Sequence, residues 1–401
     1  MTTIHPVVRR APHFLSDIGP TACSAPLAER SRLEWRRDSG GDPALLLAGF
    51  LADAGLSRPD PSEEFFGHST WRKNSVCGAA VLISAAAGAA MIRAPGGPPS
   101  PAPGVPDLVA VAFEHSGPAE PVAPPGEWRL GAWRDSWSPA EHAAAVTRVR
   151  SAIADGEVYQ VNLVGHASAP YRGDPTSALR RVTRLPGARY AGVLSGDGWA
   201  VACASPETLV EVRGGRAVTR PIKGTRPRGQ TAEEDRELAR ELWESPKDHA
   251  ELVMIVDLER NDLARVARTG SVRVDELYAV RRWCGLWQAE STVSAQLAAG
   301  TGLADLLRAL CPGGSVTGAP KRAALDVIAA LEPVGRGPSM GAFGWIGPDG
   351  IDLGLTIRTV AVDTERVHVW AGGGITWGSD PAAEVAEAAA KAGPLRAALR
   401  A

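Results

Sequence analysis

Residues 221–229 read Pro-Ile-Lys-Gly-Thr-Arg-Pro-Arg-Gly, with Lys223 near their centre. Apolar and polar side chains alternate over residues 218–222, which is typical of a β-strand, and the glycine and threonine that follow Lys223 indicate a turn. The pattern therefore predicts a strand that delivers Lys223 to a turn. A lysine at such a place is ordinarily a solvated surface residue. It becomes a nucleophile only where its surroundings hold the amine in its neutral form.

The composition of the 401-residue chain is ordinary for a globular protein, with 44% hydrophobic and 22% charged residues and a net charge of −2. This charge gives no reason to expect nucleic acid, and no apolar run is long enough to span a bilayer. The five scattered cysteines have no Cys-x-x-Cys spacing and suit a reducing compartment. We therefore expect a cytoplasmic protein with no nucleic-acid or membrane partner.

The chain divides into a less regular first third and a regular remainder. Residues 94–106 are rich in proline, which is typical of a loop. From Ser138 onward, clear signals of helices and strands follow one another, beginning with a capped helix that runs to about Ala154. We therefore predict a large mixed catalytic domain at residues 136–401, with a variable N-terminal portion at residues 1–135 packed against it.

Two later segments open like helices, Ser-Pro-Lys-Asp at 245–248 and Asp-Pro at 380–381. Each helix carries acids that the helical spacing places on one face. The residues on these faces are Asp248 and Glu251 in the first helix and Glu384, Glu387 and Lys391 in the second. Such acids are commonly a solvated face that the helix dipole favours. If the two faces meet, their oxygens suit Mg²⁺. Spacing alone does not decide between these readings.

Two further elements could receive an anionic ligand. Residues 311–321 read Cys-Pro-Gly-Gly-Ser-Val-Thr-Gly-Ala-Pro-Lys, a small-residue loop before a helix whose N–H groups could bind an oxygen, although it is not a nucleotide P-loop. Arg358 lies inside an apolar, strand-like run, where it is either an edge residue or a clamp for a carboxylate. The three glycines at 372–374 permit a close backbone approach to a ligand.

In their order along the chain, these motifs resemble those of the chorismate-utilising enzymes. This family includes anthranilate synthase component I, aminodeoxychorismate synthase component I, and the isochorismate and salicylate synthases. The resemblance spans about residues 156–391 and implies an α+β fold, with antiparallel sheets packed face to face, helices outside and the active site between them. The segments that carry it are 156–163, 205–207, 221–225, 257–262, 314–321, 357–359 and 379–387.

Two positions indicate the reaction that the resemblance implies. Isochorismate and salicylate synthases carry a lysine base where this chain has Gln160, whose amide takes no proton at neutral pH. Anthranilate synthases usually carry alanine at the position of Lys223, whereas aminodeoxychorismate synthases carry a lysine that attacks the ring. The resemblance therefore favours aminodeoxychorismate synthase. Anthranilate synthase component I is the first alternative, and a silent relative that only binds chorismate or a partner subunit is the second.

The resemblance also implies roles for individual side chains. Lys223 would attack C2 of chorismate while Glu207 acts as general acid on the C4 hydroxyl, and ammonia would then enter at C4 to give 4-amino-4-deoxychorismate. Arg358 would bind the enolpyruvyl carboxylate. The other substrate contacts would come from Thr225, Ser315, Gly372, Gly374 and Lys391.

For the metal, the resemblance implies Mg²⁺ held by Glu251 and Glu387, with Asp248 and Glu384 acting through water. This ion would bind the ring carboxylate of chorismate.

The resemblance leaves two departures and one missing part. Gln288 stands where many members have histidine, and Ser339 stands where an aromatic residue usually flanks the enolpyruvyl carboxylate. No Gly-x-Cys-x-Gly nucleophile elbow of a glutaminase occurs in the chain. A separate glutamine amidotransferase subunit is therefore the expected source of ammonia, and the product would serve para-aminobenzoate and folate synthesis or a specialised metabolite.

Overall fold

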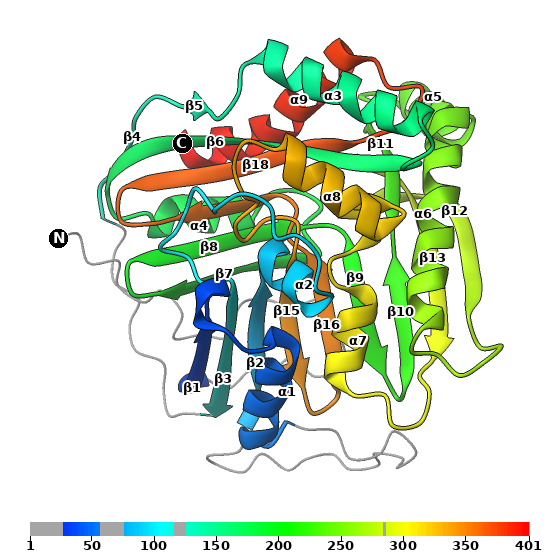
Figure 1. The fold of residues 1–401 in the computed structure, drawn as a ribbon. Coiled ribbons are helices and arrows are strands. Elements are labelled where there is room, and N and C mark those ends of the chain that lie inside the picture. Colours follow the sequence, from blue (N-terminus) through cyan, green and yellow to red (C-terminus); the bar gives the residue numbers. More distant parts are fainter. Residues whose placement is uncertain (1–26, 57–75, 116–125, 284–285, 401) are drawn as a thin grey trace.

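The computed structural model describes residues 27–56, 76–115, 126–283 and 286–400. The strands of these ranges form two antiparallel sheets (Figure 1). The first sheet has ten strands, in the order β1-β3-β2-β15-β16-β9-β10-β13-β11 with β12 beside β13. The second sheet has eight strands, in the order β14-β6-β18-β17-β8-β7 with β4 and β5 beside β6.

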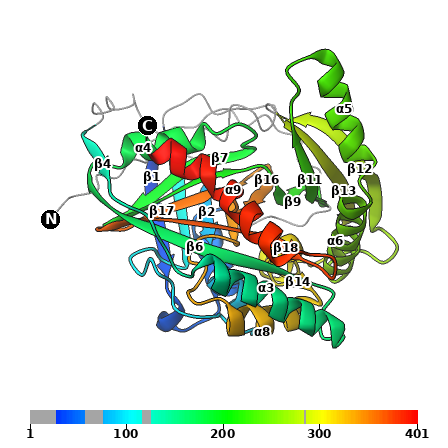
Figure 2. The same ribbon diagram turned by 90° about the horizontal axis from the view of Figure 1, so that it is seen from above.

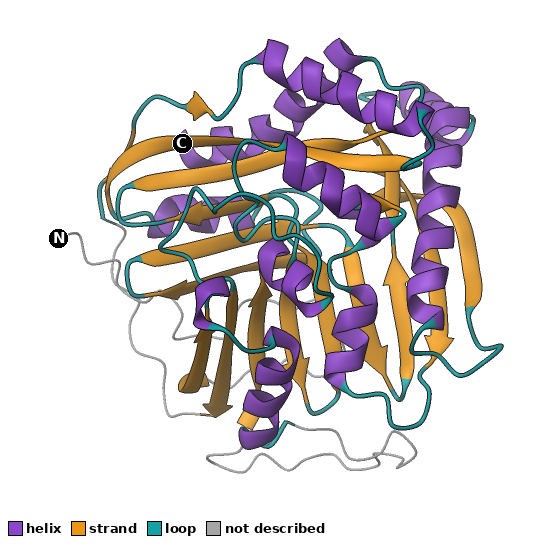
Figure 3. Cartoon of the chain, viewed as in Figure 1, coloured by secondary structure: helices purple, strands orange, loops and turns teal. Residues whose placement is uncertain are grey.

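Helices lie around these sheets (Figure 3). The first sheet comprises β1 (Leu27–Trp35), β2 (Val76–Ile83), β3 (Leu108–His115), β9 (Thr208–Arg213), β10 (Arg216–Arg220), β11 (Ile222–Pro227), β12 (Arg273–Trp283), β13 (Leu286–Gln296), β15 (Ala342–Gly347) and β16 (Gly350–Leu355). The second comprises β4 (Trp128–Leu130), β5 (Arg134–Asp135), β6 (Gln160–Gly173), β7 (Tyr190–Gly196), β8 (Trp199–Ser205), β14 (Gly318–Ala319), β17 (Thr359–Val362) and β18 (Arg366–Ile375). The helices are α1 (Pro43–Asp53), α2 (Ala85–Met91), α3 (Pro139–Ala154), α4 (Thr176–Thr183), α5 (Ala232–Trp243), α6 (Pro246–Ala264), α7 (Leu303–Leu310), α8 (Lys321–Leu331) and α9 (Pro381–Arg400), with a short 3-10 turn, η3 (Gly314–Val316), before β14.

The helix starts follow the sequence signals. Ser138 caps α3 by accepting a hydrogen bond from the Glu141 N–H, while the Glu141 carboxylate accepts one from the Ser138 N–H. Ser245 caps α6 in the same way by accepting from the Asp248 N–H, and α9 begins at Pro381. These contacts satisfy N–H groups that have no partner within a helix. The three predicted helix starts are therefore confirmed.

Strand β8 shows how the layers pack. Its side chains alternate between the two faces of the second sheet, as the pleat of a strand requires. Val201 and Cys203 belong to the same apolar core as the strands of the first sheet. Ala200 and Ala202 instead pack with Leu395 of α9 on the outer face, where Figure 2 shows α9 crossing the sheet. The predicted α+β fold, with antiparallel sheets packed face to face and helices outside, is confirmed.

The first third of the chain contributes strands to the first sheet. Strand β2 pairs with β15, so that Ile83 lies opposite Ala342, and β3 and β1 extend the sheet from there. Residues 94–106 connect α2 to β3 without a helix or strand, as their proline content predicts. The boundary at residues 135 and 136 stays a prediction, because these N-terminal strands and later strands hydrogen-bond within one sheet.

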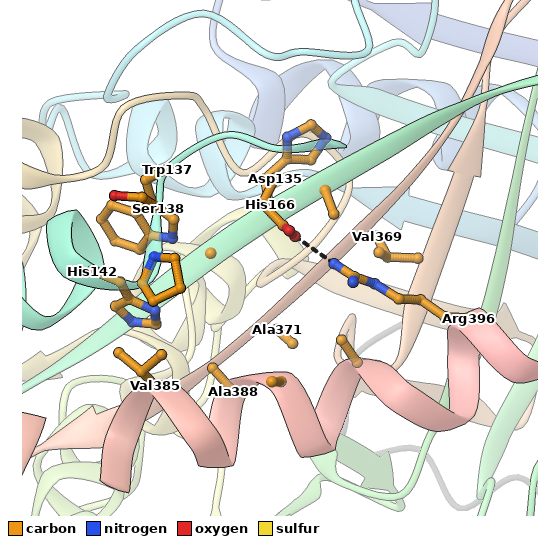
Figure 4. Close-up of a pocket in the computed structure, with 15 residues that line it drawn as sticks. Asp135, Trp137, Ser138, His142, His166, Val369, Ala371, Val385, Ala388 and Arg396 are labelled. Atoms are coloured by element: carbon orange, nitrogen blue, oxygen red, sulfur yellow. Dashed lines mark hydrogen bonds and ion pairs between the residues drawn. The ribbon is translucent and has the colours of Figure 1, made fainter. Parts of the chain in front are cut away.

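A cavity of about 150 Å³ lies between α3, α9 and the second sheet (Figure 4). Asp135 pairs there with Arg396 at 2.5 Å. Behind it, the Ser136 hydroxyl lies 2.5 Å from Nδ1 of His166, and Nε2 of that ring lies 3.1 Å from Nδ1 of His368. Burial and the neighbouring His368 lower the pKa of His166 to about 3, so that this ring is neutral. The chain of hydrogen bonds satisfies polar groups that would otherwise be buried alone.

Candidate active site

A second cavity, of about 880 Å³, is lined by all the residues that the resemblance proposed for catalysis, substrate binding and metal binding. Its lining comes from both sheets, from η3 and from helices α6 and α9. The predicted residues that line it are Glu207, Lys223, Thr225, Asp248, Glu251, Ser315, Arg358, Gly372, Gly374, Glu384, Glu387 and Lys391. A concave site of this size encloses a small organic ligand. The structure thus brings the predicted side chains together, and their roles stay predictions.

Lys223 reaches the cavity from a bulge in β11. Ile222 lies opposite Glu290 of β13 and Thr225 lies opposite Gln288, so two residues of β11 face a single residue of its partner. Gly224 has a φ of +80°, and a Cβ on it would lie 2.7 Å from Leu242 Cδ1 and 2.9 Å from the Asp248 carboxyl carbon. Bulges re-aim side chains in this way. The predicted turn after Lys223 is wrong, because β11 continues to Pro227.

The Glu207 side chain is buried near Lys223. It lies in the short link between β8 and β9, and only 4% of the residue is exposed. Its Oε1 atom has no hydrogen-bond partner among the described residues. Burial raises the pKa of Glu207, although a hydrogen bond from Ser315 and the charge of Lys223 oppose the change. A carboxyl group that keeps its proton more readily than usual can act as a general acid.

The acidic faces of α6 and α9 meet across the cavity. The ammonium of Lys247, on α6, lies 3.8 Å from Oε1 of Glu251 and 4.0 Å from Oε1 of Glu384 on α9. Glu384 also accepts a hydrogen bond of 2.7 Å from the Ser379 hydroxyl. Glu387 pairs with Lys391 at 2.6 Å. The two helices therefore face each other, and a lysine that the sequence reasoning missed lies between their carboxylates.

The carboxylates on these helices differ in their affinity for protons. Burial raises the pKa of Glu251, whose Oε1 has no hydrogen-bond partner among the described residues. Burial acts in the same direction on Glu387, but the charge and hydrogen bond of Lys391 outweigh it and lower the pKa of that group. Asp248 pairs with Arg226 at 3.1 Å, which turns its carboxylate toward β11.

These side chains fit a divalent cation only in part. No three His, Cys, Asp or Glu side chains in the described part of the chain are arranged to hold a metal ion by themselves. The oxygen of Glu251 that makes no hydrogen bond to the described residues, and the neighbouring Glu384 and Glu387, nevertheless offer hard oxygen ligands. Gly373 leaves room beside them, because a Cβ there would lie 3.0 Å from Glu384 Oε2. This arrangement suits Mg²⁺, which commonly takes one or two carboxylates and completes its shell with water and substrate.

Two of the predicted substrate-binding residues, Arg358 and Ser315, lie outside the β-strands of the sheets. Arg358 lies between β16 and β17 with a φ of +50°, and its guanidinium donates to the carbonyl of Pro186 at 2.9 Å. The reading of Arg358 as a residue within a strand is therefore wrong, and its lining position agrees with the clamp alternative. Ser315 lies in η3, and Arg336 fixes this turn by donating to the Val316 carbonyl at 2.6 Å.

The two departures from the family pattern have different surroundings. Gln288 lines the cavity. Ser339 is 1% exposed and donates a hydrogen bond of 3.1 Å to the Thr356 carbonyl, and it is not among the lining residues. The Ser339 hydroxyl is therefore engaged with the backbone, outside the lining of the cavity. Asn162 and Met340 also line the cavity, and Asn162 belongs to the quoted motif at 156–163.

Comparison with known proteins identifies the class of this site. Residues 99–397 match the family model described as chorismate binding enzyme, so the chain belongs to that family. The chain is 43% identical over 257 residues to an aminodeoxychorismate synthase component 1 from Klebsiella aerogenes, covering 64% of this chain and 57% of the relative. It is 41% identical over 281 residues to an anthranilate synthase component 1 from Streptomyces coelicolor, covering 70% of this chain and 55% of the relative. The chain thus spans little more than half the length of these relatives.

The solved structures agree on the fold. The crystal structure of anthranilate synthase component I from Streptococcus pneumoniae superposes with a TM-score of 0.73 at 22% identity, covering 94% of this chain and 93% of the other. A putative 2,3-dihydroxybenzoate-specific isochorismate synthase from Bacillus anthracis gives a TM-score of 0.65. These structures confirm the predicted fold class. None of the helices in the described ranges is long and apolar enough to cross a membrane.

Proposed function

We propose that the chain is the chorismate-converting component of an aminodeoxychorismate synthase that works in the cytoplasm. The observation that carries this proposal is the pair formed by Lys223 and Glu207, an amine and a buried acid that line one cavity. The charge of Lys223 also opposes the rise in the pKa of Glu207, and this interaction supports a joint role for the two groups. Chorismate and ammonia would be the substrates, and 4-amino-4-deoxychorismate would be the product.

In the proposed reaction, the lone pair of Lys223 Nζ forms a bond to C2 of the ring. The ring double bonds shift, the C4–O bond breaks, and the hydroxyl leaves as water with the proton of Glu207. Ammonia then bonds to C4, the double bonds shift back, and Lys223 leaves C2 as a neutral amine. The extra proton of the new C4 ammonium returns to the Glu207 carboxylate, which restores the acid. The raised pKa of Glu207 supports its role, because a protonated carboxyl must be present at the start.

Other residues would hold the substrate during these steps. Arg358 would bind the enolpyruvyl carboxylate, and the hydroxyls of Thr225 and Ser315 would donate or accept hydrogen bonds. Lys391 donates a hydrogen bond of 3.1 Å to the carbonyl of Gly372. Its charge therefore lies at the glycine-rich end of β18, where the ring carboxylate would bind. The backbone of Gly374 would contribute beside it.

A metal would complete this end of the site. Mg²⁺ bound between Glu251 and Glu387, with Asp248 and Glu384 acting through water, would bind the ring carboxylate and withdraw electron density from the ring.

The second candidate is anthranilate synthase component I, because a relative with that name is nearly as similar in sequence. For either activity, the "component 1" in the relatives' names implies a second subunit. We propose that this partner is a glutamine amidotransferase that supplies ammonia.

Product analysis tests the proposal. The protein is incubated with chorismate, Mg²⁺ and an ammonium salt, with and without an aminodeoxychorismate lyase, and the products are identified by mass spectrometry. We expect aminodeoxychorismate without the lyase and 4-aminobenzoate with it. Anthranilate would instead establish the second candidate, and unchanged chorismate would identify a chain that only binds its ligand or its partner.

A further inference from the structure

Gln160 has an unusual environment for a buried amide. It is the first residue of β6, is 0% exposed, and pairs through its backbone with Ala319 of β14. Neither Oε1 nor Nε2 of its side chain has a hydrogen-bond partner among the described residues. An amide buried without partners costs free energy, which is why nearly all such groups are paired in native proteins. The buried amide of Gln160 therefore needs a hydrogen-bond partner close to it.

The nearest candidate partner is the amine of Lys223. A Cβ on Gly374 would lie 2.6 Å from the Gln160 amide nitrogen and 3.3 Å from Lys223 Nζ. The Gln160 amide nitrogen and Lys223 Nζ therefore both lie next to Gly374. The distance between these two atoms is no greater than the sum of the two distances. The oxygen and nitrogen of an amide are assigned from hydrogen bonds, and Gln160 has none, so a half-turn of its last torsion presents the oxygen to Lys223 instead.

We propose that Gln160 is the positioning residue of Lys223, accepting an N–H of the amine so that its lone pair faces the substrate. This inference rests on the proposed function, because it assigns a role within the covalent step. The acceptor must hold an N–H both before and after Nζ bonds to C2, when the nitrogen is a secondary ammonium. An amide oxygen accepts from both forms and removes no proton. Lys223 therefore keeps its hydrogens and leaves C2 as the neutral amine when ammonia bonds to C4.

The charges around Lys223 explain why a neutral acceptor matters. Glu207 from the β8–β9 link, Glu251 from α6 and Glu387 from α9 all act on Lys223 by charge. An ionised carboxylate beside an amine favours its ammonium form, which has no lone pair to attack with. A fourth carboxylate against Nζ would strengthen that preference. Gln160 supplies the hydrogen bond without adding charge.

The first test measures Lys223 in the protein without chorismate. Wild type and Gln160→Glu are acetylated with a limiting amount of acetic anhydride at several pH values, and peptide mass spectrometry follows the modification of Lys223. Because a carboxylate within about 4–6 Å favours the ammonium, we expect the labelling midpoint of Lys223 to rise by about 1–3 pH units in the variant. Lys247, which is 58% exposed, serves as the internal control and should label equally in both proteins.

The second test follows the covalent step with Gln160→Leu, which removes the acceptor but keeps the volume. The protein is mixed with chorismate and Mg²⁺ without ammonia, quenched in acid, and the adduct on Lys223 is quantified by mass spectrometry. We expect adduct formation to slow by about 3- to 10-fold, the value of one hydrogen bond, while chorismate affinity stays unchanged. The thermal stability of this variant should be equal or higher, because an unpaired amide has been removed from the core.

The outcomes separate the two proposals. If wild type forms no adduct, the proposed function fails, while the labelling experiment still tests the contact of Gln160 with Lys223. If wild type forms the adduct, and Gln160→Leu forms it equally fast with a wild-type pH profile for labelling of Lys223, the role of Gln160 is overturned.

Discussion

The two sides of the cavity are built differently. Lys223 and Glu207 come from strands and a strand link, where Glu207 is 4% exposed and Lys223 is placed by a bulge between fixed neighbours. The opposite side comes from two helices whose acids are held largely by ion pairs. In one of these pairs, Glu387 and Lys391 have side chains that are 47% and 50% exposed. The strand side is positioned by the backbone of a buried sheet, whereas the helix side depends on which cations lie between its carboxylates.

This difference predicts unequal effects of substitution. In the proposed reaction the strand side carries the bond-making groups, so its loss would remove chemistry. The helix side carries the proposed metal ligands, so its loss would change how much cation the protein needs.

The largest effect is expected for Lys223→Ala. Removing the nucleophile should lower ammonia-dependent turnover of chorismate by at least about 10³-fold, since a catalytic nucleophile acts as a unit with its neighbours. Chorismate disappearance in a stopped assay measures this loss, and chorismate binding measured by calorimetry is the control. Unchanged turnover would contradict covalent catalysis and with it the contrast between the two sides.

Glu207→Gln should lower turnover by about 10²- to 10⁴-fold, because the amide has no proton to give to the departing hydroxyl.

The same variant should be more stable than wild type at high pH. The pKa of Glu207 is raised in the folded protein, so this carboxyl opposes folding increasingly as pH rises through its unfolded and folded values. We therefore expect the variant to resist urea better than wild type at pH 8, with a smaller difference at pH 4. An equal difference at both pH values would argue against a buried, proton-retaining carboxyl.

Glu251→Gln should affect the helix side and leave the strand side intact. We expect the Mg²⁺ concentration that gives half-maximal stabilisation in the presence of chorismate to rise by about 10- to 100-fold. Thermal melting at increasing Mg²⁺ measures this without an activity assay. Asp257→Asn on the same helix is a suitable control, because Asp257 pairs with Arg260 and does not line the cavity. A Mg²⁺ requirement unchanged in both variants would remove Glu251 from the proposed metal site.

The smallest effect is expected for Lys247→Met. Its ammonium lies between Glu251 and Glu384, so it occupies the region that the proposed cation would enter. An exposed ion pair contributes less than about 1 kcal/mol, so we expect only a slight loss of stability without metal. Mg²⁺ should bind a few-fold more tightly, because one competing positive charge is gone. Weaker Mg²⁺ binding would show that the lysine supports the metal site instead of competing with it.

The sequence predicted which residues form the site better than it predicted how they are positioned. Local sequence signals and the family resemblance together pointed to the catalytic, substrate-binding and metal-binding candidates, but they gave no role to Lys247, which lies between the carboxylates of α6 and α9. The bulge at Lys223 and Gly224 was not predicted, because it depends on pairing with β13, more than sixty residues later in the chain. The ion pair of Asp248 with Arg226 likewise depends on how α6 packs against β11.

Other errors have a similar cause. The apolar run before Arg358 suggested a continuous strand, but the chain turns there with a positive φ between two different sheets. Ser339 stands where the family usually has an aromatic residue, and its hydroxyl bonds the Thr356 carbonyl outside the cavity lining. Both outcomes are set by tertiary neighbours that local patterns do not encode.

The pairing of β2 with β15 matters for anyone who wishes to express a shorter catalytic fragment. A fragment that starts at residue 136 would lose β1, β2 and β3 and leave the hydrogen-bonding edge of β15 bare. Bare, apolar edges recruit strands from other molecules and cause aggregation. Phe343 and Ile346, both buried in the full chain, lie on the strand that would be uncovered. Truncation should therefore be placed before β1, at residue 26 or earlier.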